Sequence, residues 1–420
     1  MVSRNGTCIR VLQVFAGTNR GGTELRTLDV MRHLDRARFR MDYCVLSGRP
    51  GTLDEEIRAL GGEVFPCRLG LSFSWRFGRL LHAHRFDVVH AHVHHFAGWI
   101  LRLAAHSGVP VRVAHFNSSH DGRADTLRRR LQRRVMCRWI DRHATHVLAV
   151  SEAAMEEAWR PDWRDDRRCA VVYDGLPVIP FEGPADRAGV RKEFGWPLEC
   201  PLAIHVGRLA PPKNHGRLLA VFRAWRQRRP EARLLVVGSG PPPAQDLLRR
   251  QVGALGLEEG VALAGERTDV ARLLKASDVL VFPSLWEGLP GAVLEACAAG
   301  TPVVASDLAT VREVARHFPR VECVGLERPD DQWAHAIDQT FRSVPSEAER
   351  HAARRALAAS PFGIERCVAN LCRVWQGGEK AGNFPLPELP EAGRDAGMVV
   401  APVGTAPFLP RNRRDRPCLE

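Results

Sequence analysis

The sequence predicts an α/β fold with two doubly wound halves, each built on a parallel sheet, and three observations support it. The chain has 420 residues, enough for two ordinary domains with full cores. Apolar residues make up 45% and charged residues 26% of the chain, which is the balance of a globular protein. Short apolar runs alternate with helical stretches in two successive series, and a stretch rich in proline and glycine separates the series.

The first half is predicted to span residues 1–178. A strand over 11–15 is followed by a glycine-rich turn and a helix over 23–34. Further short strands are expected at 41–46, 63–66, 87–92, 111–115 and 146–150. Because helical segments separate most of these strands, the sheet is expected to be parallel.

A linker is predicted over 179–200, where proline and glycine recur, and the second half over 201–360. The strands of this half are expected at 202–206, 232–237, 261–264, 279–282, 302–305 and 321–324, with helices over 215–228, 244–255, 270–276 and 291–299. A last helix within 361–376 is expected to pack back on the first half. The tail 377–420 lacks periodicity and is expected to be disordered.

Several absences favour a cytoplasmic protein. No run of 18 or more uncharged apolar residues occurs, so no segment is expected to span a bilayer. The first ten residues lack the apolar core and the cleavage site of a secretory signal. The eleven cysteines are irregularly spaced and contain no C-x-x-C pair, which predicts neither a disulfide framework nor a zinc site.

The net charge of +12 is concentrated in the segment 123–143, which carries eight arginines and two aspartates. Apolar residues recur every four positions through it, at Leu127, Leu131, Val135 and Trp139. This pattern predicts an amphipathic basic helix, suited to an anionic membrane surface at the inner face of the plasma membrane. A solvated basic face is the alternative interpretation. No nucleic-acid-binding signature accompanies the charge, so nucleic acid is not expected as a partner.

The strongest chemical signal is a pair of carboxylates. Glu287 is expected in a strand-to-helix loop, and Glu295 eight residues later on the following helix. Eight residues advance a helix face by only about 80° beyond two full turns, so both carboxylates can face one site. The segment Gly288, Leu289 and Pro290 leads into the helix N-terminus, whose free N–H groups favour an anion such as a diphosphate.

Two cations precede this pair in the chain. Arg208 and Lys213 lie in the loop after the first strand of the second half. Fixed cations beside a diphosphate can stabilise a departing nucleotide without a metal ion. The sequence holds no D-x-D motif that would supply a carboxylate pair for magnesium or manganese.

The residues Arg208 and Lys213, the turn Gly238-Ser239-Gly240-Pro241 and the spacing Glu287-x7-Glu295 together resemble the retaining glycosyltransferases of the family-4 type. The resemblance runs from about Arg10 to Trp375. It implies a GT-B fold, in which two Rossmann-like domains face each other across a cleft. The segments 19–24, 87–92 and 110–115 are most similar to enzymes that build exopolysaccharides or capsules.

The resemblance implies a role for each matching residue of the second half. Arg208 and Lys213 would bind the diphosphate of a nucleotide sugar and assist its departure. Glu287 would hold hydroxyls of the donor sugar, and Glu295 would hold the ribose. The backbone around Gly265 and Arg267 would border the base, which in this family is usually uridine.

Roles are also implied for the first half. Gly21 and Gly22 would let the backbone approach donor phosphate or acceptor, and His115 would reach the donor sugar near the reacting carbon. Ser151 and Glu152 match a family element at the domain interface. The acceptor is expected to be a glycan, free or linked to a polyprenyl diphosphate. No cofactor is expected beyond the nucleotide-sugar donor.

Other interpretations remain open on the sequence alone. The carboxylates are also compatible with a helix cap and a solvated helix residue, and isolated cations with an ordinary surface. A nucleotide-sugar epimerase and a non-catalytic nucleotide-sugar-binding protein would share the same fold. The loop 17–22 does not match the dinucleotide fingerprint G-x-G-x-x-G, which disfavours a dehydrogenase.

Two further features complete the prediction. A histidine cluster invites a metal interpretation, but no carboxylate or cysteine completes a tetrahedral set there; its members are His82, His84, His90, His92, His94 and His95. The chain also has Asp174-Gly175 where the resembled family commonly has Asn-Gly.

Overall fold

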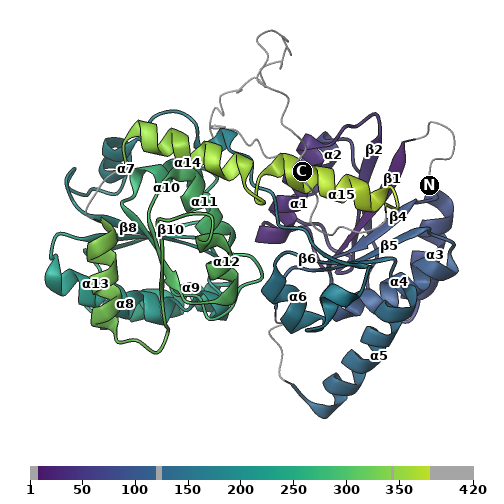
Figure 1. Cartoon of the computed structure of the whole chain (residues 1–420). Coiled ribbons are helices and arrows are strands. Elements are labelled where there is room, and N and C mark those ends of the chain that lie inside the picture. Colours follow the sequence, from purple (N-terminus) through teal and green to yellow (C-terminus); the bar gives the residue numbers. More distant parts are fainter. Residues whose placement is uncertain (1–7, 120–124, 342–344, 379–420) are drawn as a thin grey trace, which may run out of the picture. The chain divides into compact units, whose positions relative to one another are not determined.

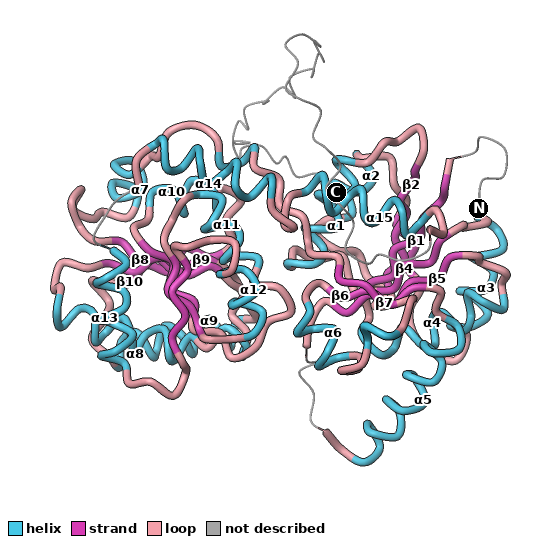
Figure 2. Tube along the Cα trace, in the orientation of Figure 1, coloured by secondary structure: helices cyan, strands magenta, loops and turns pink. Residues whose placement is uncertain are grey.

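Figure 1 shows the computed structural model of the chain, which describes residues 8–119, 125–341 and 345–378. Within these residues two parallel sheets form, one of seven strands and one of six, and helices cover both faces of each (Figure 2). The prediction of two doubly wound α/β halves is confirmed. The tail expected at 377–420 lies outside the described residues from position 379 onward.

The first sheet has the strand order β3-β2-β1-β4-β5-β6-β7, and every neighbouring pair is parallel. Its strands are β1 (Ile9–Phe15), β2 (Phe39–Val45), β3 (Val64–Pro66), β4 (Val88–Ala91), β5 (Val111–Phe116), β6 (His146–Ala149) and β7 (Cys169–Val171). The sequence predicted all of them except β7, which lies in the apolar run 169–173 just before the proline- and glycine-rich stretch.

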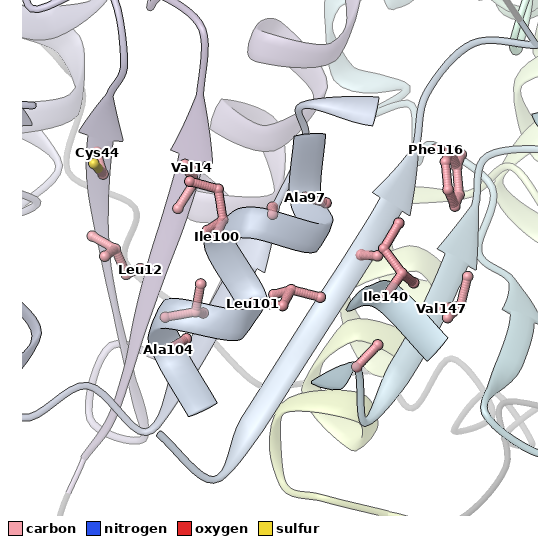
Figure 3. Close-up of a cluster of buried hydrophobic side chains, with 14 of the residues drawn as sticks. Leu12, Val14, Cys44, Ala97, Ile100, Leu101, Ala104, Phe116, Ile140 and Val147 are labelled. Carbon is pink, nitrogen blue, oxygen red and sulfur yellow. The ribbon is translucent and has the colours of Figure 1, made fainter. Parts of the chain in front are cut away.

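Alternate residues of each strand face opposite layers of the core. In β1, Leu12 and Val14 join one buried cluster, whereas Val11 and Phe15 join another. The first cluster lies under helices α3 (Phe73–His84), α4 (Ala97–His106), α5 (Leu127–His143) and α6 (Glu152–Ala158). Figure 3 shows Ile100 and Leu101 of α4 packed toward these strands.

The opposite face of the first sheet is covered by α1 (Gly22–His33), α2 (Asp54–Ala59) and, from the far end of the chain, α15 (Ile364–Trp375). Leu371 and Trp375 of α15 are buried in the same cluster as Val11 and Leu28. The last described helix therefore completes the core of the half that begins the chain.

The second sheet has the order β10-β9-β8-β11-β12-β13 and is also parallel throughout. Its strands are β8 (Leu202–Val206), β9 (Arg233–Val237), β10 (Val261–Gly265), β11 (Val279–Phe282), β12 (Val303–Ser306) and β13 (Val321–Val324). Each lies within one or two residues of its predicted position.

Helices again form two layers. One face of the second sheet is covered by α7 (Arg187–Glu193), α10 (Val270–Ala276), α11 (Gly291–Ala299), α12 (Ala309–Ala315) and α14 (Glu347–Ala359). The other face is covered by α8 (His215–Arg228), α9 (Pro242–Ala254) and α13 (Asp330–Phe341). Short 3₁₀ turns occur at η1 (His94–Phe96), η2 (Trp163–Asp165), η3 (Ile179–Phe181) and η4 (Pro211–Lys213).

The structure differs from the expected linker over 179–200. This segment contains α7, in which Val190 and Arg191 are fully buried. Arg191 donates hydrogen bonds to the carbonyl of Cys200 and to Asp278, next to β11. These contacts join α7 to the second half.

Both sheets change their winding direction at one place, between β1 and β4 in the first and between β8 and β11 in the second. Loops leaving the carboxyl ends of such strands diverge, and open α/β sheets bind ligands in the space between them. Gly21 and His92 follow β1 and β4, and Lys213 and Glu287 follow β8 and β11. Predicted site residues of both halves thus follow the strands that flank the reversal points.

Candidate active site

At the reversal point of the second sheet, a cation and a carboxylate from neighbouring loops meet. Lys213 Nζ lies 2.6 Å from Glu287 Oε1, and only 19% and 11% of the two side chains are exposed. A backbone bond of 2.8 Å from Leu285 N–H to the carbonyl of Pro212 joins the same two loops. The prediction that these residues share a site is consistent with this geometry, since low exposure strengthens a charged pair.

Lys213 lies beside an aromatic ring and two neutral imidazoles. Its Nζ lies 4.8 Å from the centroid of the Phe282 ring. Burial first, then the neighbouring His215 and Lys213, lowers the pKa of His205 to about 3. Burial and then Lys213 lower the pKa of His215 to about 4. These imidazoles are therefore neutral and do not compete with Lys213 for an anion.

Glycines let the loops of this edge approach one another. Gly238 has a φ of +135°, and a Cβ there would lie 2.0 Å from the carbonyl oxygen of Gly207, so a larger residue does not fit. Gly207 in turn faces the side chain of Lys213, which would lie 3.0 Å from an added Cβ. The N–H of Gly238 donates to the carbonyl of Gly265 at 2.7 Å, which brings Gly265 to the same edge.

Glu295 uses a different cation from Glu287. It lies on α11, which begins after Pro290 without a side-chain cap, and it pairs with Arg26 of α1. Burial raises the pKa of Glu295, and Arg26 partly offsets this effect. The two carboxylates of the E-x7-E spacing are thus each held by a cation, and one of these cations comes from the first half.

The segment Gly288 to Pro290 lies against the first half. Ser151 Oγ donates to the carbonyl of Gly288 at 2.6 Å, and a Cβ on Gly288 would lie 2.1 Å from the carbonyl oxygen of Asn117, just after β5. Leu289 packs against core residues of both halves. This loop can keep its position only with glycine at 288.

A second contact joins the halves at α6. Glu313 of α12 accepts hydrogen bonds from the N–H groups of Glu152 and Ala153 and from the hydroxyl of Tyr173. The carboxylate therefore caps the first turn of α6 from the other half, where an anion is favoured by the free N–H groups. Ser151 and Glu152 lie at this contact.

The glycine-rich loop of the first half approaches the exposed Arg208. Gly21 precedes α1 in an extended conformation, and a Cβ there would lie 2.4 Å from Glu24 Oε2, whereas Gly22 has open space around it. Burial raises the pKa of Glu24, and Arg208 acts in the opposite direction. The charge of Arg208 therefore acts on the first turn of α1.

His115 lies at the end of β5 and is 5% exposed. It contacts His90 of β4, whose Nε2 lies 3.0 Å from His115 Nδ1. His92 follows β4 and completes a group of three histidines whose ring nitrogens lie within 4.8 Å of one another. His115 is thus held within a buried polar cluster rather than in the apolar core.

Arg267 is placed differently from the other predicted site residues. Its guanidinium pairs with Asp269 at 2.8 Å and with Glu193 of α7 at 2.7 Å. These hydrogen bonds, those to Asp269 first, raise the pKa of Arg267 and engage its guanidinium with carboxylates. Only its backbone remains suited to the predicted contact with a base.

Sequence reasoning missed Arg26 and Asn117. Arg26 lies one turn after Gly22 on α1, so a cation facing the glycine-rich loop was readable from helical spacing. Its partner Glu295 is 269 positions away in the chain, however, and no local pattern predicts that contact. The backbone of Asn117 was equally hidden, because its role depends on the approach of Gly288.

Comparison with known proteins shows which family shares these features. The family description "Glycosyl transferases group 1" matches residues 200–343, and "Glycosyl transferase 4-like domain" matches residues 21–175. The glycosyltransferase EpsF of Bacillus subtilis is 28% identical over 378 residues, which cover 88% of this chain and 97% of that protein. A capsular polysaccharide biosynthesis glycosyltransferase of Staphylococcus aureus, CapH, is 29% identical over 332 residues, 78% of this chain and 90% of CapH.

Among solved structures, HepE of Anabaena in complex with UDP and glucose is similar in fold. It superposes with a TM-score of 0.72 at 20% sequence identity, over 87% of this chain and 98% of HepE. Since the two family matches cover both halves and the similarity to EpsF extends along almost all of both proteins, the chain belongs to the group 1, family-4-like glycosyltransferases and is a glycosyltransferase of the GT-B fold.

Proposed function

We propose that the chain transfers a hexosyl group from a nucleoside diphosphate sugar, a UDP-sugar, to a glycan or a polyprenyl-diphosphate-linked glycan during polysaccharide biosynthesis. The transfer retains the anomeric configuration and needs no metal ion. The observation that carries the proposal is the Lys213–Glu287 pair at the reversal point of the second sheet. Arg208 lies in the loop that also holds Lys213 and supplies a second cation for the same diphosphate.

The two halves divide the work. Residues 201–360 bind the donor, residues 1–178 receive the acceptor, and the helix within 361–376 completes the first half from behind. This division is supported by the placement of the cations and both carboxylates in the second half. It is also supported by α15, which packs with α1 in the core of the first sheet.

Within the donor site each residue has one task. The diphosphate lies near Arg208, Lys213 and the uncapped N-terminus of α11, where positive charge and free N–H groups suit an anion. Glu287 binds hydroxyls of the sugar, Glu295 those of the ribose. The base borders the backbone at Gly265 and Arg267, at the carboxyl end of β10.

Gly21, Gly22 and His115 serve the donor from the first half. The open space at Gly22 lets backbone approach phosphate or acceptor. His115 bonds an oxygen of the sugar near the reacting carbon. Gly288, Leu289 and Pro290 hold the donor loop against the first half, so that both sets of residues reach one substrate.

The chemistry follows from this arrangement. The bond between the anomeric carbon and the diphosphate oxygen breaks, and Lys213 and Arg208 stabilise the charge that develops on the leaving group. The acceptor hydroxyl attacks the same face of the sugar, and its proton passes to the departing diphosphate. Atoms and charge balance without a metal ion or an enzyme nucleophile.

The test is nucleotide release from a panel of nucleotide sugars, with a polysaccharide acceptor and the chelator EDTA present. We expect one donor to be consumed by the wild type, and consumption to collapse in Glu287→Gln and in Lys213→Ala. Turnover that requires metal, or that ignores both substitutions, would refute the proposed site.

The product distinguishes the remaining alternatives. A retained configuration in the glycan product, determined by NMR of the anomeric proton, supports the proposed transfer. An inverted product contradicts the stereochemistry, and an isomerised sugar formed without acceptor would identify an epimerase. Binding of the donor without turnover would identify a non-catalytic binding protein.

We also propose that the chain is cytoplasmic and binds the inner face of the plasma membrane through α5. No helix among the described residues has the length and apolarity to cross a bilayer. The first two turns of α5 expose Leu127 and Leu131, 80% and 63% exposed, among arginines. Apolar residues flanked by arginine suit insertion between anionic headgroups.

The other end of α5 is anchored, which leaves the exposed turns to project. Ile140 is fully buried, and the rings of Trp139 and Trp99 lie 5.0 Å apart. A Cβ on Gly98 of α4 would lie 2.2 Å from the carbonyl oxygen of Met136, so the two helices pack closely there. The exposed apolar turns support the membrane surface over the alternative of a solvated basic face.

Sedimentation with vesicles tests this proposal. The full chain should bind vesicles of phosphatidylglycerol more strongly than vesicles of phosphatidylcholine, and less strongly as salt rises. The double variant Leu127→Glu, Leu131→Glu should lose binding, while the control Leu247→Glu, at an exposed leucine of α9, should keep it. Equal binding of both variants would contradict a role for α5.

A further inference from the structure

The three histidines at the carboxyl edge of the first sheet form a connected polar group. The rings of His90 and His115 stack with centroids 5.1 Å apart and planes 11° apart, and His92 stacks on His90 at 4.4 Å. His90 lies on β4, His92 follows β4, and His115 lies on β5, all beside the reversal point of the sheet. Their hydrogen bonds, taken one nitrogen at a time, fix where each proton lies.

The chain of bonds begins at Trp375 of α15. Its indole N–H can only donate, and it donates to His90 Nδ1 at 3.2 Å. His90 Nδ1 must therefore carry a lone pair, and a neutral His90 must carry its proton on Nε2. This Nε2 lies 3.0 Å from His115 Nδ1 and donates to it.

His115 has then only one place for its own proton. Because Nδ1 accepts from His90, the neutral ring carries its proton on Nε2. Among the described residues His115 Nε2 is buried without a hydrogen-bond partner, although the side chain is 5% exposed. A buried donor without an acceptor is unfavourable, so a substrate oxygen that accepts from it gains binding energy.

His92 does not compete for this position. Asn117 Nδ2 donates to His92 Nδ1 at 3.1 Å, and His92 Nε2 lies 2.9 Å from the side-chain oxygen of Gln13, to which it donates. Both nitrogens of His92 are thus engaged. Burial also holds the pKa of His90 and of His115 well below the ordinary value, so both rings are neutral.

The same bonds argue against a metal ion in this cluster. A metal bound by His90 Nε2 needs a lone pair there, and the other nitrogen of a metal-bound histidine normally donates a proton. Trp375 cannot accept one, so His90 would have to lose both of its ring protons. The cluster is suited to relaying hydrogen bonds and not to ligating a cation.

We propose that Trp375 and His90 are positioning residues that hold His115 as the Nε2–H tautomer, so that it donates a hydrogen bond to an oxygen of the donor sugar. The inference rests on the proposed function, because it assigns the hydrogen bond to the transferred sugar. It has a chemical consequence. A protonated Nε2 cannot take the proton of the acceptor hydroxyl, and that proton goes to the leaving diphosphate.

The first test replaces the indole N–H and keeps an aromatic ring. In Trp375→Phe, His115 is free to exchange tautomers, and kcat should fall about tenfold while the KM for the donor changes less than about twofold. The matched control is Trp333→Phe. Trp333 is equally buried and donates to the carbonyl of Gly325 at 3.1 Å, but it lies in the second half.

A second test reads the tautomer itself. Long-range ¹H–¹⁵N correlation spectra of protein labelled at histidine, without substrate, should show the His115 proton on Nε2 in the wild type and in Trp333→Phe. In Trp375→Phe a share of Nδ1–H should appear. His90→Leu should lower kcat like Trp375→Phe, and His90→Gln, whose amide can donate near the Nε2 position, should restore most of it.

The outcomes separate this inference from the function on which it rests. An Nδ1–H tautomer of His115 in the wild type overturns the relay, and so does equal loss of kcat in Trp375→Phe and Trp333→Phe. A wild type that transfers no sugar refutes the proposed function alone, since the tautomer is measured without substrate. Folding of each variant is checked by its thermal unfolding midpoint, and His90→Gln keeps the test informative if Trp375→Phe is unstable.

Discussion

The carboxyl edges of the two sheets share one geometry and differ in chemistry. Both sheets run through the order 3-2-1-4-5-6 counted along their own strands, so both place loops at the same kind of reversal point. The second sheet fills this place with charge, in Lys213, Glu287 and the nearby Arg208. The first fills it with the neutral rings of His90, His92 and His115. The topology of a sheet fixes where a ligand can bind, and the side chains there decide which part of the ligand is bound.

The difference matches the two ends of a nucleotide sugar. A diphosphate is a permanent anion whose departure is eased by fixed positive charge. The hydroxyls of a sugar are neutral, and a neutral imidazole N–H offers them a hydrogen bond without a cost for burying charge. The comparison therefore predicts that charge changes matter most in the second half and that protonation matters most in the first.

Removing the cation of the charged edge should have the largest effect. Lys213→Ala leaves Glu287 without its partner and the departing diphosphate without a cation. We expect kcat for nucleotide release to fall about 10²–10³-fold. The matched control, Lys192→Ala on the exposed side of α7, should stay within twofold of the wild type. Similar rates for both variants would remove the contrast between the two edges.

Moving the charged edge relative to the neutral one should have the next largest effect. In Gly288→Val the new side chain meets the carbonyl of Asn117, so the donor loop must shift away from the first half. A shift of about 1 Å at a reacting group costs up to about a hundredfold in rate, and we expect a loss of that order in kcat/KM. Gly78→Ala on α3 is the control, because a Cβ at Gly78 meets nothing within 4 Å and this helix takes no part in the proposed donor site. Equal kinetics of the two variants would show that this contact is dispensable.

The smallest expected effect is on stability, and it concerns a carboxyl group of the first half, Asp174. Burial raises the pKa of Asp174 to about 7, opposed by Arg26 and assisted by Asp29. A folded pKa above the unfolded value means that this group favours the folded state below about pH 4, and that the advantage is lost as the pH rises through about 7. Asp174→Asn removes that loss.

Thermal unfolding at pH 5 and pH 8 measures this effect. The free energy of unfolding of Asp174→Asn should exceed that of the wild type by about 1–3 kcal/mol at pH 8 and by less at pH 5. The exposed Asp246→Asn on α9 should show no such pH dependence. A gain that is the same at both pH values would contradict a buried, proton-bearing Asp174. The common Asn of the resembled family at this position is in keeping with a neutral Asp174.

The sequence predicted the sheets well and the contacts between them poorly. Strands such as β11 and helices such as α8 matched their predicted bounds, because apolar periodicity is a local property. The spacing of Glu287 and Glu295 predicted that both carboxylates face one site, and this stays a prediction. Their partners did not follow from it, since Glu295 meets Arg26 of the first half.

The histidine relay shows the same limit. The cluster of histidines was visible in the sequence, but its meaning depends on Trp375, which is 285 positions from His90 in the chain. Without the Trp375–His90 hydrogen bond, the same histidines fit both a metal site and a hydrogen-bond relay. Helix α7 was hidden for a related reason, since proline and glycine around it mask a short helix whose stability comes from Arg191 and its distant partner Asp278.

Among the described residues α15 is the last helix to be synthesised, yet it completes the half of the molecule that is synthesised first. While a ribosome translates the second half, which takes on the order of 10–40 s at about 5–20 residues per second, the face of β1 that holds Val11 lacks its final cover. The nascent first half is then a natural client for chaperones, which bind exposed apolar surface. Because Trp375 arrives with the same helix, a chain that ends before α15 lacks the indole N–H that donates to His90. Under the proposed relay, synthesis to the end of α15 is then a condition for full activity.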